Sequence, residues 1–140
     1  MKKRLILGLL ALSTAMEVAS SSLDYAQVEQ VNAVQSDEGT WCFSTTVRHN
    51  DEGWEHYADG WQVADLKGNQ LGLRDLAHPH DNEQPFTRRL CNVIIPKDLT
   101  KLVVSAKCNQ HGYGHQSIEV DLTKTKGDGF TVKSSFLEAH

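Results

Sequence analysis

The sequence predicts an all-β protein: an antiparallel sandwich of about seven strands, of the immunoglobulin or fibronectin type III kind. Several segments alternate apolar and polar residues, and turn-forming residues separate these segments at short, regular intervals. No sustained helical period follows residue 22. Short alternating strands at such spacing are typical of two packed antiparallel sheets.

The first two strands are predicted at residues 26–34 and 41–47. The second is the clearer, because Trp41, Phe43, Thr45 and Val47 fall on one face and smaller or polar residues on the other. This alternation predicts a strand with one buried face.

A hairpin is predicted next. Residues 57–63 form its first strand, with Trp61 as a core residue, and Lys67-Gly68-Asn69 is a turn signal. Residues 70–76 read as the returning strand.

Three segments complete the predicted sandwich. Residues 85–96 hold a strand with a bulge near Cys91 and Asn92, where the alternation slips. Residues 101–108 alternate so that Leu102, Val104, Ala106 and Cys108 share a face, and residues 117–122 form the last strand. The pattern of residues 95–122 resembles the last third of a fibronectin type III or related immunoglobulin-like domain.

The chain begins with the pattern of a secretory signal peptide. Lys2, Lys3 and Arg4 precede the apolar run 5–12, which small residues follow. This run is shorter than the roughly 20 residues that a bilayer span requires. We therefore expect a signal peptide at 1–22, with the cleavage position left open, and a single sandwich domain at 23–140. The product is expected to be soluble and periplasmic or secreted, without a membrane anchor or a cysteine placed for lipidation.

The charge excludes some partners. Removing residues 1–22 lowers the formal net charge from −4 to −6, and no basic run remains. Nucleic acid is therefore not an expected partner.

The three cysteines, Cys42, Cys91 and Cys108, leave the disulfide pairing open. An oxidising compartment permits a disulfide, but an odd count leaves at least one cysteine outside it. None lies in a CxxC or CxxCH pattern, so thioredoxin-like chemistry and covalent haem attachment are not supported. For Cys108 we expect a buried apolar role or half of a disulfide.

Histidines gather in the loops. The run HPHDNEQPF at 78–86 contains two, and the connections around it contain four more. In a sandwich of this topology the three loops meet at one end. The six histidines expected there are His49, His56, His78, His80, His111 and His115.

This arrangement suggests a metal site. Pro79 keeps its neighbour extended, so His78 and His80 project to the same side with Cα atoms roughly 6.5 Å apart. Two imidazoles at this spacing can reach one copper or zinc ion. A third ligand would be His111 or His115, and further candidates are His49, His56, Glu83 and Cys108. The alternatives are a polar turn without metal and, for Glu83, an acceptor that fixes a histidine tautomer or an ion pair with Arg88 or Arg89.

Four blocks resemble a family of small exported bacterial proteins with no assigned activity. They are W-x-H-Y-A-D-G-W at 54–61, L-G-x-R-x-L-x-H-P-H at 71–80, E-Q-P-F-T-R at 83–88 and H-G-Y-G at 111–114. The resemblance implies that the important positions lie in the three loops. Ser and Asp are more usual in that family at the positions of Cys91 and Cys108, which argues against either cysteine as a shared ligand.

The sequence is also compatible with two other functions. A non-catalytic interaction module would use Trp54, Tyr57 and Tyr113 to contact a protein partner. A cupin-type metalloenzyme would use Gly72, His78, His80 and Glu83, which resemble the first cupin motif. The glutamate is too close to His80, however, and the second motif is missing. Catalysis has no positive support in the sequence.

Overall fold

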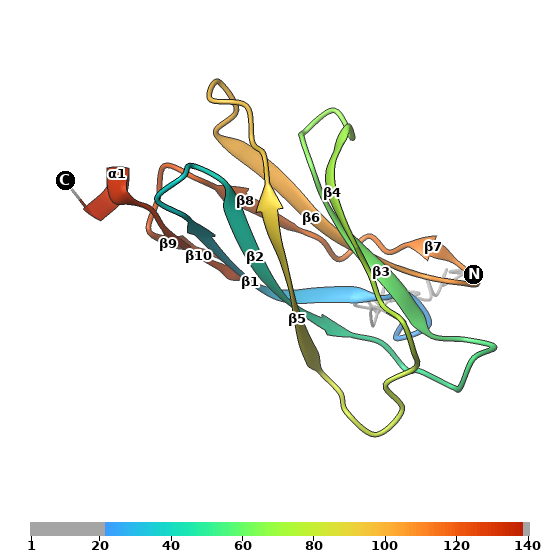
Figure 1. Ribbon diagram of the computed structural model, residues 1–140. Coiled ribbons are helices and arrows are strands. Elements are labelled where there is room, and N and C mark those ends of the chain that lie inside the picture. The colour runs from blue at the N-terminus through green and yellow to red at the C-terminus, as the bar shows by residue number, and fades with distance from the viewer. Residues whose placement is uncertain (1–21, 139–140) are drawn as a thin grey trace, which may run out of the picture.

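The computed structural model describes residues 22–138 and consists of two β-sheets packed face to face (Figure 1). In the first sheet the strand order is β5-β2-β1-β10-β9. The strands are β5 (Phe86–Val93), β2 (Trp41–Arg48), β1 (Gln27–Gln35), β10 (Phe130–Lys133) and β9 (Lys126–Gly127).

The second sheet has the order β4-β3-β6-β7, and β8 also pairs with β6. Its strands are β4 (Gln70–Asp75), β3 (Ala58–Ala64), β6 (Lys101–Cys108), β7 (Gly112–Tyr113) and β8 (Ile118–Asp121). A four-residue helix, α1 (Ser135–Glu138), ends the described part of the chain. Within residues 22–138 no helix has the length and apolar content to cross a membrane.

The strand order confirms the predicted all-β sandwich. Neighbours β5-β2-β1 face neighbours β4-β3-β6-β8, which is the fibronectin type III arrangement. One pairing differs from the antiparallel expectation, because β10 runs parallel to β1 with Val31 opposite Phe130. The short strands β7, β9 and β10 were not expected.

The strand order does not agree with the cupin alternative. A cupin is a jelly roll, whose first two strands lie in opposite sheets. Here β1 and β2 are direct neighbours in one sheet. The partial likeness of residues 72–83 to a cupin motif is therefore not accompanied by the fold that the motif requires.

The core follows the predicted alternation. In β2, residues 41, 43, 45 and 47 are buried, and in β6, residues 102, 104, 106 and 108 are buried. Trp61 is fully buried between the sheets. Both sheets thus contribute one apolar face to a shared core, as burial of alternating residues requires.

The predicted bulge lies in β5. The register of β5 against β2 shifts between Trp41 and Phe43, and Asn92 adopts a left-handed conformation with φ 59°. A disulfide joins Cys42 and Cys91 across these neighbouring strands. The pairing left open by the sequence is thereby settled, with Cys108 as a buried free thiol.

Candidate metal centre

Three buried side chains converge at the loop end of the core. His49 follows β2 directly and keeps the inward parity of Val47, while His56 has the inward parity of Ala58 at the start of β3. Cys108 is the last, inward-facing residue of β6. Their exposed fractions are 1%, 7% and 2%, respectively. Strand alternation therefore aims His49 and Cys108 into one enclosed space, and His56 lies beside them from the β2–β3 connection.

The distances within this cluster suit a metal ion. Nε2 of His49 lies 3.2 Å from Nε2 of His56. The nitrogen and sulfur ligand atoms of His49, His56 and Cys108 all lie within 4.8 Å of one another. Two nitrogens bound tetrahedrally to one ion at 2.0–2.1 Å are about 3.3 Å apart. The group could therefore hold a metal ion with little movement of the two rings.

A backbone oxygen completes the donor set. The carbonyl oxygen of Asp24 lies 3.0 Å from Nε2 of His49 and 3.2 Å from Nε2 of His56. The same oxygen is 3.4 Å from Sγ of Cys108. Two imidazole nitrogens, one sulfur and one carbonyl oxygen thus surround a common point.

Neighbouring groups orient these donors. Oδ1 of Asp51 lies 2.5 Å from Nδ1 of His49, so Nδ1 carries the hydrogen and the lone pair of Nε2 is free to face His56. Oε1 of Glu52 lies 3.7 Å from Nδ1 of His56. Carboxylates behind liganding histidines are a regular feature of metal sites because they fix the ring and its tautomer.

The carboxylate of Asp51 connects three segments. Besides His49, it accepts the backbone N–H of Ala58 at 2.9 Å and that of His80 at 2.7 Å. Burial by itself raises the pKa of Asp51, but these hydrogen bonds together outweigh it and leave the pKa below its ordinary value. Asp51 is therefore a buried carboxylate that joins both loops to the start of β3.

The segment that supplies the Asp24 carbonyl is held by the loop after β6. A Cβ atom at Gly114 would lie 2.3 Å from the carbonyl oxygen of Ala26. Only glycine permits this approach of two backbones. The close contact keeps residues 24–26 against the end of the sandwich.

The three histidine-bearing connections, β2–β3, β4–β5 and β6–β8, lie at one end of the molecule (Figure 1). The Asp51–His80 hydrogen bond joins the first two, and ring contacts join the first and the third. The rings of His49 and His56 are 4.6 Å apart, and those of His56 and His111 are 5.3 Å apart. Tyr25 lies 5.0 Å from His111 and 6.3 Å from His115. His111 and His115 are exposed and border the cluster from outside.

His78 and His80, the first pair that the sequence suggests as ligands, have ring centroids 4.5 Å apart. Nε2 of His80 accepts a hydrogen bond from Nη2 of Arg88 at 3.0 Å, and its ring stacks on Phe86 at 4.0 Å. His78 is exposed, with Nδ1 3.0 Å from the carbonyl oxygen of Pro79. Because a guanidinium covers the nitrogen that would bind the ion, the two rings do not form a ready chelate.

The electrostatics of His80 agree with this arrangement. Burial lowers its pKa, and the nearby charge of Arg88 lowers it further. Nδ1 of His80 is buried without a hydrogen-bond partner in the described structure and lies 3.9 Å from Oδ2 of Asp51. The surroundings therefore favour a neutral imidazole with its hydrogen on Nδ1.

Glu83 forms the ion pair that was one of its sequence-based alternatives. Its Oε2 lies 3.5 Å from Nη2 of Arg88. Among the described residues, two groups have the spacing of metal ligands, and Glu83 is in neither. The second group shares His56 with the first and adds the exposed Asp24 and Glu52.

The HPHDNE run lines an open hollow of about 540 Å³, and Gly53 and Trp54 complete its lining. Trp54 is 65% exposed and contacts Tyr57 edge-on. Trp54 is thus a rim residue of a surface hollow.

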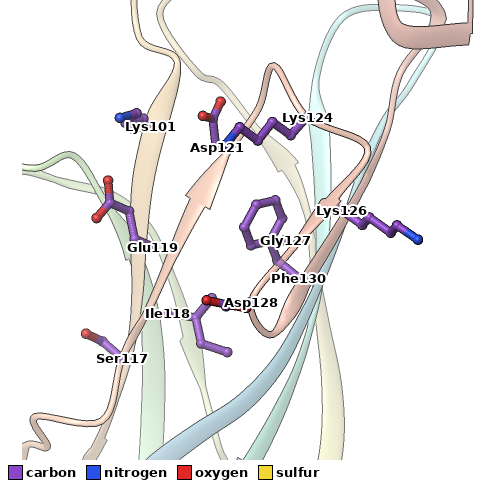
Figure 2. A pocket seen from close by; sticks show the side chains of 10 residues that line it. All are labelled: Lys101, Ser117, Ile118, Glu119, Asp121, Lys124, Lys126, Gly127, Asp128 and Phe130. Carbon is purple, nitrogen blue, oxygen red and sulfur yellow. The ribbon is translucent and has the colours of Figure 1, made fainter.

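A second hollow, of about 530 Å³, lies between β8 and the β9–β10 hairpin, and no histidine lines it (Figure 2). Lysines and acids alternate around it, Phe130 and Ile118 supply apolar surface, and Lys126 points away from it. Such mixed lining does not specify a class of ligand.

Cys108 is the member of this cluster to which the sequence pattern gave least weight as a ligand. Its inward parity in β6 predicts a buried apolar role or half of a disulfide, and the structure confirms the burial but not the disulfide. The useful signal was that His49 and Cys108 both extend the buried face of a strand into the same end of the sandwich.

Comparison with known proteins identifies a relative of unassigned activity over part of its length. No family model and no solved structure matches the chain. A curated protein of Halomicrobium mukohataei named "Putative lipoprotein" is 38% identical over 109 residues, which cover 76% of this chain and 53% of that protein. The chain thus spans about half the length of the curated relative that it matches.

Proposed function

We propose that the protein is an exported metal-binding protein that holds one copper or zinc ion between His49, His56 and Cys108. The observation that supports this most directly is the 3.2 Å separation of the two Nε2 atoms, which face each other inside the core. Imidazole and thiolate ligands suit both metals.

The hydrogen bonding of the cluster without an ion supports the proposal. With the hydrogen of His49 on Nδ1, Nε2 of His49 is an acceptor that lies 3.0 Å from a second acceptor, the carbonyl oxygen of Asp24. Two buried acceptors in contact with no hydrogen between them are an unfavourable arrangement. An ion at the common point would use all four groups as ligands instead.

Burial of the cluster favours holding an ion over metal-assisted hydrolysis. Catalytic zinc sites keep a coordination position open to water or substrate. Here the three side chains are almost fully buried and a backbone oxygen takes the fourth direction. Storage, transfer or electron carriage fits this enclosure.

Export is part of the proposal. The charged, apolar and small-residue order of residues 1–22 supports it, although these residues are, apart from Ser22, outside the described structure. A lipoprotein is an exported protein, so the name of the Halomicrobium relative agrees with this.

The experiment is metal titration of the metal-free protein, with elemental analysis of the bound ion. We expect one ion per chain, with binding weakened at least tenfold by Cys108→Ser or His56→Asn. His78→Asn is the matched control, because His78 is exposed and outside both candidate groups. Absence of copper and zinc binding, or full affinity in both ligand variants, would overturn the proposal.

A second candidate function is a protein-interaction module. The exposed ring of Trp54 on the rim of the 540 Å³ hollow favours it, since aromatic side chains dominate many interfaces. The test is affinity capture with chelator-treated protein and with Trp54→Ala. A partner that is retained without metal and lost with the variant would support this function.

A further inference from the structure

We infer that the ion is copper, and that the centre alternates between Cu(II) and Cu(I) with the Cys108 thiolate as a permanent ligand. This inference rests on the proposed function, because it names the metal and the chemistry of the same site.

The composition of the donor set is the first argument. Two imidazole nitrogens, one cysteine sulfur and a backbone oxygen in a further direction form the ligand set of copper electron-transfer sites. The three side-chain donors come from His49, His56 and Cys108. Structural zinc sites, in contrast, are usually closed by four side chains.

The position of the oxygen is the second argument. The Asp24 carbonyl lies at similar distances, 3.0, 3.2 and 3.4 Å, from the two nitrogens and the sulfur. The two nitrogens and the sulfur define a triangle, and an oxygen at these distances lies above that triangle rather than in its plane. This is the direction of a weak axial ligand, which tunes the potential of such copper sites.

The surroundings of the sulfur are the third argument. The backbone N–H of His111 donates to Sγ of Cys108 at 3.3 Å, which stabilises negative charge on the sulfur. Cys108 is also the cysteine that the Cys42–Cys91 disulfide leaves free. A buried cysteine sulfur with a backbone donor is thus available as a ligand.

The rigidity of the site is the fourth argument. His49 is held by Asp51 and follows β2 directly, Cys108 ends β6, and His56 lies two residues before β3. Electron transfer is fast when both oxidation states share one geometry. In the proposed step Cu(II) gains one electron and becomes Cu(I), while the two Cu–N bonds and the Cu–S bond remain.

The exposed ring of His111 gives the electron a route to the surface. It lies 5.3 Å from the His56 ring and 5.0 Å from the Tyr25 ring. A redox partner that contacts this face would approach the ion through one intervening ring.

The experiment adds one equivalent of copper(II) sulfate to the metal-free protein and records the visible and electron paramagnetic resonance spectra. We expect an intense visible thiolate-to-copper(II) charge-transfer band. Ascorbate, as the one-electron reductant, should remove the band, and ferricyanide, as the oxidant, should restore it. Mass spectrometry after the cycle should find Cys108 still a free thiol.

The variants separate the inference from the proposed function. Cys108→Ser should abolish the band, and His78→Asn should leave it unchanged. Copper bound without the band, a band that survives Cys108→Ser, oxidation of Cys108 by the added copper, or binding of zinc alone would overturn the inference while metal binding still stands. If neither copper nor zinc binds, the proposed function itself fails.

Discussion

Oδ2 of Asp51 accepts the backbone N–H of His80 at 2.7 Å, although the two residues are 29 positions apart. The other oxygen of the same carboxylate faces Nδ1 of His49. One buried side chain therefore orients a candidate ligand and anchors the HPHDNE loop.

Replacing this carboxylate should affect both stability and metal binding. Asp51→Asn replaces one acceptor oxygen with an NH₂ group, which is a donor. One of the buried N–H groups that Asp51 accepts would then face this NH₂ group without an acceptor. We expect a loss of about 2–4 kcal/mol in the free energy of unfolding and a 10–100-fold loss of metal affinity. Chemical denaturation and metal titration measure the two effects.

Asp81→Asn is the control for that variant. Asp81 is exposed and accepts a hydrogen bond from the N–H of Gly53 at 3.1 Å. A change below about 1 kcal/mol is expected because solvent can replace the lost contact. Equal effects of the two variants would contradict the special role of Asp51.

His80 should make stability depend on pH. Its pKa in the folded state lies below the ordinary 6.5, so between these two values the unfolded chain binds more protons than the folded chain. Stability is therefore fully present above about pH 6.5 and falls as the pH drops below it. The lowered pKa of Asp51 acts only below 3.8, which separates the two effects.

The measurement compares the metal-free protein with His80→Gln between about pH 4.5 and 7. The variant is expected to be less stable at neutral pH, because the ring stacked on Phe86 is lost, and to lose less stability on acidification. Parallel pH profiles for the two proteins would show that His80 does not carry this dependence.

The cysteines give a prediction that thiol counting can check. Without reductant, the folded protein should expose no reactive thiol, and the unfolded protein should expose one, that of Cys108. Reduction should bring the count to three. Because the disulfide closes a separation of 49 residues, its reduction should cost on the order of 4 kcal/mol in unfolding free energy.

Glu83→Gln tests the alternative that Glu83 is a ligand. The Glu83 side chain is 59% exposed and pairs with Arg88, so we expect a stability change below about 1 kcal/mol. Metal affinity should remain unchanged, because Glu83 is outside both candidate groups. A tenfold loss of metal affinity would indicate that Glu83 is a ligand and that the HPHDNE loop forms the binding site.

Much of the fold could be predicted because alternation in β2 and β6 records which face is buried. The parallel strand β10 could not, since its four residues are too few to show a period and its partner β1 is about 100 positions away in the sequence. The bulge at Asn92 was predictable, because a slip in alternation is the local signature of an extra residue.

The gathering of histidines at one end of the sandwich could be predicted, but not which of them would form the buried cluster. Topology alone brings the three histidine-bearing loops to one end. Which nitrogens remain available depends on partners that the local sequence does not reveal. Arg88, on β5, covers Nε2 of His80, whereas Asp51 leaves Nε2 of His49 free.

The pairing of β10 with β1 has a consequence for any shortened form of the protein. Since β10 covers the outer edge of β1, a chain ending after residue 122 would leave the backbone N–H and C=O groups of β1 without these partners. A long uncovered edge is a template for intermolecular strand pairing. Strand β10 therefore protects the edge of β1 from pairing with a second molecule. Loss of this strand should appear first as aggregation.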